Sequence, residues 1–419
     1  MAGGADPPEE ETSLSVQPSE LPLRGIRVLD LSAVISGPMA TALLADQGAE
    51  VIKVEPPAGD QSRRIGPAHG DLSAMFIGVN RGKRSIVLDL KRPDHLEVLH
   101  DLVARADVLV ENFRPGAMAR LGLGADTLCA VHPRLIYVSI SGFGQSGPYA
   151  AARVYDAVIQ AVSGISASHP NQISGEPTIL ATTVCDKLTA LNAAQAISAA
   201  LFARERSGLG TRLQLSMLDA ALAFQWPDAM NNLSFVSKPP QAFPEFGVRQ
   251  RAYKTRDGHV ATMTPQQDEF AALCRGLGHP ELAADPRFCS GDARRHNVAE
   301  LVPLLAALIA EHDTDELVDS LRAAGVPIGR VNQRHEVISD AQVLHNRALV
   351  EVDQGDAGTV RLARPAARFG IGAQVAPMPG VAPRLGEHGR AVLAELGYDE
   401  ARIDALLALG AAAEGAGHA

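Results

Sequence analysis

The sequence contains little of several residue types that define particular protein classes. Cysteine accounts for only 4 of its 419 residues, and the four are scattered without a C-x-x-C pair. This usage is typical of a reducing compartment and argues against a disulfide framework. The histidines form no H-E-x-x-H motif and no cluster with the cysteines. The sequence therefore predicts no metal site.

Long apolar runs and net positive charge are also missing. No run of about 18 apolar residues is free of charged or strongly polar residues, which argues against a membrane span. The formal net charge of −10 argues against a nucleic-acid partner. Residues 1–20 are acidic and proline-rich, without the basic and apolar regions of a signal peptide. We expect a disordered acidic tail on a cytoplasmic protein with neither a nucleic-acid nor a membrane partner.

The length and composition fit an ordinary globular protein with two domains. The chain is 46% hydrophobic with a mean hydropathy of +0.02, and 419 residues exceed one average domain. Proline-rich residues 236–249 indicate a linker. We expect a large domain at residues 21–235 and 340–410, a smaller domain at 245–330, and a frayed tail at 411–419.

Apolar strands alternate with helices in the N-terminal part of the chain. Strands are expected at 26–31, 51–54, 85–90, 108–110 and 135–140. Because these strands are apolar throughout, they predict an α/β fold with a mainly parallel sheet covered on both faces. A hairpin around Asp257-Gly258 followed by helices makes the smaller domain α+β. Strands at 348–352 and 359–362 and a helix at 387–396 return to the large domain.

A glycine-rich loop at 142–147 formally matches G-x-G-x-x-G. A dinucleotide-binding loop should follow the first strand of its fold, with an acidic residue about 20 positions later. This loop follows the fifth strand and is interrupted by Pro148. We interpret it as an active-site loop or a plain turn.

The best candidate for a reactive side chain is Asp186. A long Ala- and Leu-rich helix is expected at 188–203, so Asp186 should lie in a first helical turn. Free backbone N–H groups and the helix dipole stabilise a carboxylate there, so we expect it to be ionised at neutral pH. It could then act as a nucleophile, or serve only as a good helix-start residue. Its neighbour Cys185 is interpreted as a small buried thiol rather than a nucleophile.

Basic residues are concentrated between Arg81 and Arg92, where five accompany a single acid. Basic side chains at the carboxyl ends of parallel strands suit a polyphosphate ligand. Ordinary solvated turns would have the same composition. The run alone does not separate these alternatives.

Several short motifs occur in a fixed order between residues 21 and 405. They are GIRVLD with Gly37-Pro38, GAEVIKVE, KRSI with Asp89 to Lys91, VENFRPG, the loop at 142–149, VYD at 154–156 and LGEH at 385–388. Together they resemble the family III CoA-transferases, which include formyl-CoA transferase, carnitine CoA-transferase and α-methylacyl-CoA racemase. One such motif would be weak, whereas the ordered set is specific.

The resemblance implies a fold, an assembly and a mechanism. The fold is a Rossmann-like large domain formed by the N- and C-terminal parts plus a smaller domain, and two subunits form an interlocked homodimer. Asp186 is implied as the nucleophile that passes CoA from an acyl-CoA to a small carboxylic acid through an aspartyl-CoA thioester. Acyl-CoA is then a substrate, and no permanently bound cofactor is expected.

The same motif matching implies which residues line the CoA channel. They are Ile35, Ser36, Leu88, Asp89, Leu90, Lys91, Asn112, Phe113, Arg114, Arg120, Arg153, Val154 and Tyr155. Two departures from formyl-CoA transferase accompany them. Pro56 stands where that enzyme has an arginine, and no glycine run matches its mobile active-site loop.

Two alternative functions remain beside CoA transfer. Racemases of this family carry a histidine where this chain has Tyr155, and an unperturbed tyrosine, with a pKa of about 10, is a poor proton acceptor. CoA transfer is therefore favoured over racemisation, with Tyr155 as a candidate catalytic residue. Asp156 is either a second acid/base or a buried structural carboxylate. The other alternative is a non-catalytic acyl-CoA binding protein.

Overall fold

The computed structural model describes residues 21–171, 174–240, 251–369 and 380–412. The predicted tail at 1–20, most of the predicted tail at 411–419 and much of the predicted linker lie outside these residues. The chain divides into two compact units. The large unit comprises Met1–Ser166, Ile179–Phe224 and Arg347–Ala419, and the small unit comprises Ala167–Thr178 and Gln225–Asn346.

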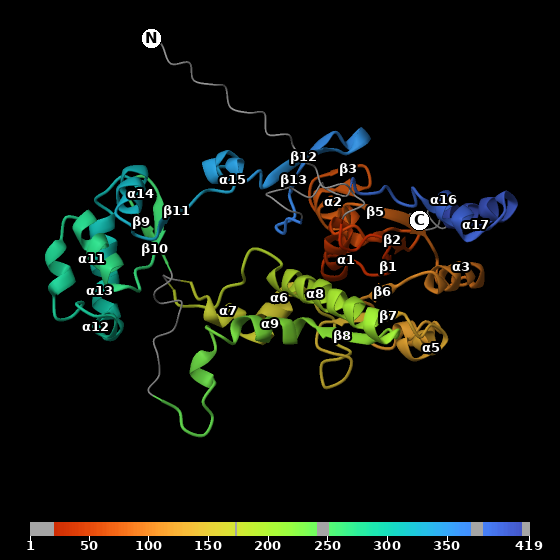
Figure 1. The fold of residues 1–419 in the computed structure, drawn as a ribbon, viewed down its shortest axis with the longest axis horizontal. Coiled ribbons are helices and arrows are strands. Elements are labelled where there is room, and N and C mark those ends of the chain that lie inside the picture. Colours follow the sequence, from red (N-terminus) through yellow and green to blue (C-terminus); the bar gives the residue numbers. More distant parts are fainter. Residues whose placement is uncertain (1–20, 172–173, 241–250, 370–379, 413–419) are drawn as a thin grey trace, which may run out of the picture. The chain divides into compact units, whose positions relative to one another are not determined.

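A six-stranded parallel sheet forms the centre of the large unit (Figure 1). Its spatial order is β5 (Lys83–Val87), β2 (Glu50–Glu55), β1 (Arg27–Asp30), β6 (Val108–Glu111), β7 (Ile136–Ser141) and β8 (Arg212–Ser216). All neighbouring strands run parallel. The predicted α/β class is confirmed. The chain builds outward from β1 to β5 and then returns to β6, so the topological switch point lies between β1 and β6.

Helices cover both faces of this sheet, as the apolar strands predict. On one face α1 (Ser36–Asp46) and α8 (Val184–Ser207) pack on the strands. The other face is covered by α3 (Pro93–Ala104), α5 (Ala125–Val131), α16 (Gly389–Leu396) and α17 (Glu400–Ala412). The C-terminal helices therefore complete a core that the N-terminal strands begin.

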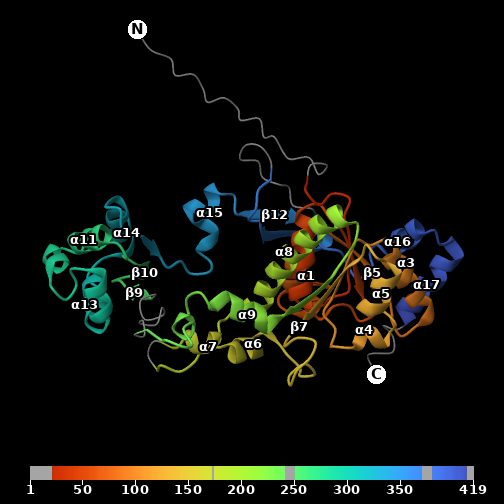
Figure 2. The same ribbon diagram turned by 60° about the horizontal axis from the view of Figure 1, so that its bottom comes forward.

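The two helices α1 and α8 lie side by side in both ribbon views (Figure 2). Buried alanines at their contact, such as Ala40, Ala190 and Ala193, allow close approach of the two backbones. The helix predicted at 188–203 is confirmed and begins four residues earlier, at Val184. It ends at Ser207 and is followed by Gly208, whose φ of 74° is the left-handed conformation common after helices.

The small unit contains a three-stranded antiparallel sheet and a helical layer. Its strands are β9 (Ala252–Lys254), β10 (His259–Thr262) and β11 (Ile328–Arg330), and its helices include α11 (Gln267–Gly276), α12 (Gly291–His296), α13 (Val298–Ile309) and α14 (Thr314–Ala323). The hairpin predicted around Asp257-Gly258 is confirmed as β9 and β10. The helices bury Phe270, Leu273 and Leu321 against this sheet.

A second hairpin in the large unit confirms the strands predicted after residue 340. It consists of β12 (Leu349–Asp353) and β13 (Thr359–Ala363). The described residues also form β3 (Ala68–His69), β4 (Leu72–Ser73), α2 (Ala74–Asn80), α4 (Ala117–Arg120), α6 (Asp156–Ser163), α7 (Ile165–Ser168), α9 (Met217–Gln225) and α15 (Ala341–His345). Among the described residues, no helix combines the length and apolar character that crossing a membrane requires.

Candidate active site

Asp186 lies in the first turn of α8, as the sequence predicts. Its backbone N–H donates a 2.9 Å hydrogen bond to Oδ2 of Asp156. Ser36, the first residue of α1, acts on this carboxyl group, because its hydroxyl and its backbone N–H both lower the pKa of Asp186. The N-terminal ends of α1 and α8 therefore meet at this one carboxylate.

The surroundings of Asp186 raise the pKa of its carboxyl group to about 7. Burial is the main cause, and the Asp156 charge adds to it, whereas hydrogen bonds from Ser36 and the charge of Lys187 oppose it. The sequence predicts an ionised Asp186 at neutral pH, whereas its surroundings favour the protonated form more than that prediction allows. Desolvation and the charge of Asp156 raise the pKa of Asp186 by more than the helix dipole lowers it.

Asp156 begins α6 and is only 6% exposed. Its Oδ1 accepts a 2.6 Å hydrogen bond from Nε2 of Gln160, one turn along the same helix. Gln160 also fixes the segment that leads into α8, because its Oε1 accepts from the Leu180 N–H at 2.8 Å. These bonds favour the structural interpretation of Asp156. Sequence reasoning missed Gln160, although its spacing of four from Asp156 was a usable signal.

The loop between β1 and α1 holds Ser36 through an unusual backbone conformation. Val34 has a φ of 72°, which is strained for a β-branched residue. Its N–H donates to Oδ1 of Asp60 at 3.1 Å. The preceding Ala33 is bracketed by Asn112, whose Oδ1 accepts from the Ala33 N–H at 2.9 Å and whose Nδ2 donates to the Ala33 carbonyl at 2.8 Å.

A buried ion pair between Lys53 and Asp60 lies next to this loop and holds it in place. Nζ of Lys53 lies 2.9 Å from Oδ2 of Asp60, and both side chains are almost completely buried. The same Nζ donates to the Ser32 carbonyl at 2.9 Å. Sequence reasoning missed both partners. The available signal was a lysine inside the otherwise apolar strand VIKV.

A cavity of about 400 Å³ opens at the ends of β1, β2 and β5. Five residues predicted to line the CoA channel line it, namely Leu88, Asp89, Leu90, Lys91 and Phe113. Its wall also includes Pro56, Asp60 and Lys53. The predicted strand at 85–90 ends at Val87 instead, and the three following residues form part of this wall.

The other predicted CoA residues do not line this cavity. Ile35 and Ser36 are buried. Asn112 is half-buried, and its side chain forms the hydrogen bonds to Ala33 described above. Four side chains are exposed, namely Arg114, Arg120, Arg153 and Tyr155.

The glycine-rich loop after β7 contacts the predicted CoA segment that precedes α6. Val154 and Phe143 of this loop both pack against the apolar cluster that contains Ile159. A Cβ at Gly142 would collide with the Val154 side chain, so only glycine fits there. The loop therefore lies against the segment that leads to Asp156, and not in a dinucleotide-binding arrangement after the first strand.

Most of the basic run between Arg81 and Arg92 is bound within the protein. Lys83 is fully buried, with Nζ 2.8 Å from Oδ2 of Asp30. Arg81 pairs with Asp46, and Arg84 pairs with Glu395 at 2.7 Å. These ion pairs favour a structural role for Arg81, Lys83 and Arg84 over a phosphate site. Lys91 is exposed and lines the cavity.

Two other chemistries find little support at this site. Cys185 is fully buried, and burial, with smaller contributions from Asp156 and Asp186, raises the pKa of its thiol to about 12. Its thiolate is therefore scarce at neutral pH. Within the described part of the chain, no group of three or more His, Cys, Asp or Glu side chains is arranged to hold a metal ion.

Comparison with known proteins establishes the family. The model for CoA-transferase family III matches residues 23–389. The chain belongs to CoA-transferase family III. This family III enzyme is 37% identical over 395 residues to the succinyl-CoA:glutarate CoA-transferase of Mus musculus, covering 93% of this chain and 90% of the relative.

Further relatives agree with this assignment. The acetyl-CoA:oxalate CoA-transferase of Acetobacter aceti is 36% identical over 388 residues, covering 91% of this CoA-transferase and 97% of the relative. The crystal structure of a CAIB/BAIF family protein from Brucella suis superposes with a TM-score of 0.76 at 34% identity, covering 90% of this chain and 99% of that one. This family III CoA-transferase therefore shares its fold with the Brucella suis protein along nearly its whole length.

Proposed function

We propose that this enzyme moves CoA from an acyl-CoA to a short carboxylic acid, with Asp186 as the nucleophile. The observation that carries the proposal is a carboxylate at the shared N-terminal ends of α1 and α8, with a pKa near neutrality. A pKa of about 7 leaves enough carboxylate to react, and the ionised form is more basic than an ordinary aspartate.

The first half of the reaction forms a covalent CoA intermediate. An Asp186 carboxylate oxygen attacks the thioester carbonyl, the C–S bond breaks, and CoA leaves as a thiolate from a mixed anhydride. The thiolate then attacks the Asp186 carbonyl carbon, which releases the donor acid as its carboxylate. The enzyme now holds an aspartyl-CoA thioester, so the thioester energy is conserved.

The second half repeats these steps with the acceptor. The acceptor carboxylate attacks the aspartyl thioester, and the thiolate leaves. The thiolate then attacks the acceptor carbonyl of the new anhydride, giving the product thioester and free Asp186. No oxidant, metal or cofactor is consumed.

Ser36 is proposed to stabilise the charge that develops at Asp186. Its hydroxyl and its backbone N–H both favour the ionised form of Asp186 and lower the pKa of that group. When a thiolate or a carboxylate attacks the aspartyl carbonyl carbon, negative charge develops on the carbonyl oxygen of Asp186. Hydrogen-bond donors that are already in place stabilise this charge most effectively. Its position is supported by the Asp60 and Asn112 bonds to the preceding loop.

CoA is proposed to enter the cavity beside Lys91. The cavity lies at the strand ends near the topological switch point, where ligands of open α/β sheets bind. Its volume of about 400 Å³ suits part of a CoA molecule, bounded by Leu88, Leu90 and Phe113. The exposed Arg114 and Arg120 are proposed to contact the phosphates.

We propose a dicarboxylic acid as the acceptor, because the relatives named above act on glutarate and oxalate. Racemisation is less well supported, since Tyr155 is 68% exposed. A direct test incubates the enzyme with succinyl-CoA or acetyl-CoA and a series of dicarboxylic acids, and identifies new thioesters by mass spectrometry. Exchange of the α-proton without any new thioester would favour racemisation. No turnover with any thioester and acid would favour a non-catalytic binding protein.

A further inference from the structure

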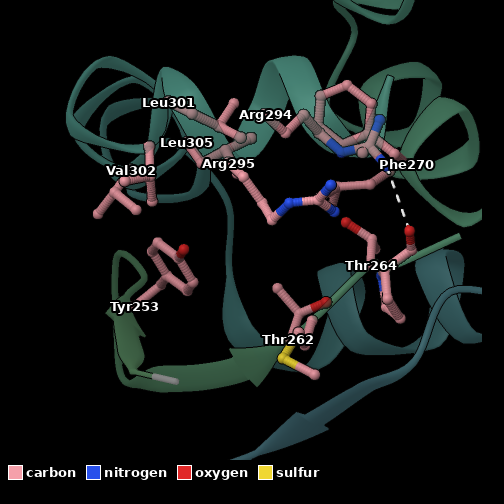
Figure 3. Close-up of a pocket in the computed structure, with 14 residues that line it drawn as sticks. Tyr253, Thr262, Thr264, Phe270, Arg294, Arg295, Leu301, Val302 and Leu305 are labelled. Carbon is pink, nitrogen blue, oxygen red and sulfur yellow. Dashed lines mark hydrogen bonds between the residues drawn. The ribbon is translucent and has the colours of Figure 1, made fainter. Parts of the chain in front are cut away.

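The small unit contains a cavity of about 300 Å³ that is separate from the residues described above (Figure 3). One wall is apolar and comes mainly from α13, with Leu301, Val302 and Leu305 facing the ring of Tyr253. The opposite side is polar and contains Thr264 and Arg294. The volume lies at the lower end of small-molecule sites, which span about 300–1,000 Å³.

Arg294 is a buried cation without an acidic partner. The residue is 8% exposed, and Nη1 donates to Oε1 of Gln267 at 2.7 Å and to the Phe288 carbonyl at 3.1 Å. Nη2 donates to the Pro265 carbonyl at 3.3 Å. Its guanidinium lies 4.4 Å from the ring centre of Phe270. In the portion of the chain that the structure describes, no carboxylate forms an ion pair with it.

An uncompensated buried charge is energetically unfavourable. Arginine keeps its proton in proteins, so Arg294 cannot escape this cost by becoming neutral. Carbonyl and amide oxygens solvate the charge but do not cancel it, and burial of an unpaired charge normally costs several kcal/mol. Its neighbour Arg295 differs, because it pairs with Asp292. The polar side of the cavity therefore carries one positive charge, that of Arg294, which no negative charge of the described residues balances.

The two walls together define the ligand chemistry. A cation beside hydroxyl groups favours an anionic head group, and the α13 wall favours an aliphatic body. We propose that this cavity binds a short- or medium-chain aliphatic carboxylate, with its carboxylate at Arg294 and its chain along α13. The proposal does not depend on CoA transfer, because every lining residue belongs to the small unit.

The test is a titration of the full-length protein with 6,6,6-trifluorohexanoate, followed by ¹⁹F NMR. Saturable binding is expected, and trifluorohexanol and trifluorohexylammonium should bind at least about 10-fold more weakly. Equal affinities for the carboxylate and the alcohol would overturn the proposal, because the charge of Arg294 would then play no part.

Variants locate the binding within the small unit. Val302→Phe fills the apolar end of the cavity and should weaken trifluorohexanoate binding at least about 10-fold. Ala307→Phe adds the same ring at an exposed position of the same helix and should leave binding unchanged. Arg294→Gln should also lose trifluorohexanoate binding, and circular dichroism would show whether this variant is folded. If it is not folded, the result for Val302→Phe alone tests the proposal.

Asp186→Asn separates this cavity from the active site. The variant should bind trifluorohexanoate as the wild type does, even if it transfers no CoA. Unchanged binding in Val302→Phe, or lost binding in Asp186→Asn, would place the carboxylate elsewhere and overturn the proposal.

Discussion

At the residue scale, the reactivity of Asp186 is set by three opposing influences. Burial and the charge of Asp156 raise its pKa, whereas Ser36 donates hydrogen bonds that favour the ionised form. The net result is a carboxyl group whose pKa is raised to about 7. Both the pH dependence of the reaction and the stability of the protein follow from this balance.

The rate of CoA adduct formation should rise with pH, with a midpoint near 7, because only the ionised carboxylate attacks. Asp156→Asn removes a negative charge and should move the midpoint to lower pH. Lys187→Met removes a positive charge and should move it to higher pH. Single-turnover kinetics between pH 5 and 9 would measure all three midpoints. Shifts of the two variants in the same direction would contradict the electrostatic explanation.

Asp186→Asn should make the folded protein more stable at alkaline pH. The unfolded chain ionises this group at its ordinary pKa of 3.8, and the folded chain does so only near 7, so folded-state stability falls as pH rises between these values. Asparagine does not ionise, so the variant avoids this loss in the free energy of unfolding, which is at most about 4 kcal/mol above pH 7. Urea unfolding of both proteins at pH 5 and pH 8 would test it. A stability difference independent of pH would count against the raised pKa.

At the element scale, the site depends on loops that long-range contacts hold in place. The loop before α1 is fixed by Asp60 and Asn112, which lie 26 and 79 residues away from their partners in the loop. The segment before α8 is fixed by Gln160, 20 residues from Leu180. The backbone strain at Val34 is therefore balanced by hydrogen bonds that only the assembled sheet provides.

The sequence predicts the regular elements well because their signals are local. Apolar runs mark the parallel strands, and the alanine-rich run after Asp186 marks α8. The ion pairs of Arg81, Lys83 and Arg84 could not be predicted in this way, because their acidic partners come from β1, α1, β2 and α16. The raised pKa of Asp186 also depends on packing between elements, which sequence patterns do not report.

The basic segment between Arg81 and Arg92 provides a matched pair of variants. Lys91→Ala should weaken CoA binding about 10-fold, equivalent to about 1.4 kcal/mol, because Lys91 is exposed at the cavity. Arg84→Ala removes an equal charge whose partners are Glu50 and Glu395, and it should leave CoA affinity unchanged. Calorimetric titration with CoA would compare the two. Equal losses would indicate a general electrostatic field instead of a local contact.

At the scale of the whole molecule, the exposed apolar surface supports an assembly. Leu191 and Phe202 on α8 and Phe224 on α9 are all more than half exposed. Large apolar side chains that are exposed to this degree are typical of a surface that a partner covers. We propose that the partner is a second copy of the chain in an interlocked homodimer, as the family resemblance implies.

An interlocked homodimer should persist on dilution, because its subunits cannot separate without unfolding. Sedimentation velocity at submicromolar concentration should show only dimer, and refolding should be slow. Phe202→Glu should reduce the yield of dimer, whereas Val131→Glu, equally exposed on α5, should not. A folded monomer of the wild type at low concentration would contradict the interlocked arrangement.

The most direct measurement of the central claim is the position of the covalent CoA adduct. Wild-type enzyme given acyl-CoA without an acceptor should accumulate an aspartyl-CoA thioester, which hydroxylamine or borohydride should convert to a stable product on Asp186. Peptide mass spectrometry locates this modification. Asp186→Asn keeps most of the shape and capping ability of the side chain, so it should fold, bind acyl-CoA and form no adduct. An adduct on Asp156 or Cys185, or CoA transfer that survives in Asp186→Asn, would contradict the assignment of the nucleophile.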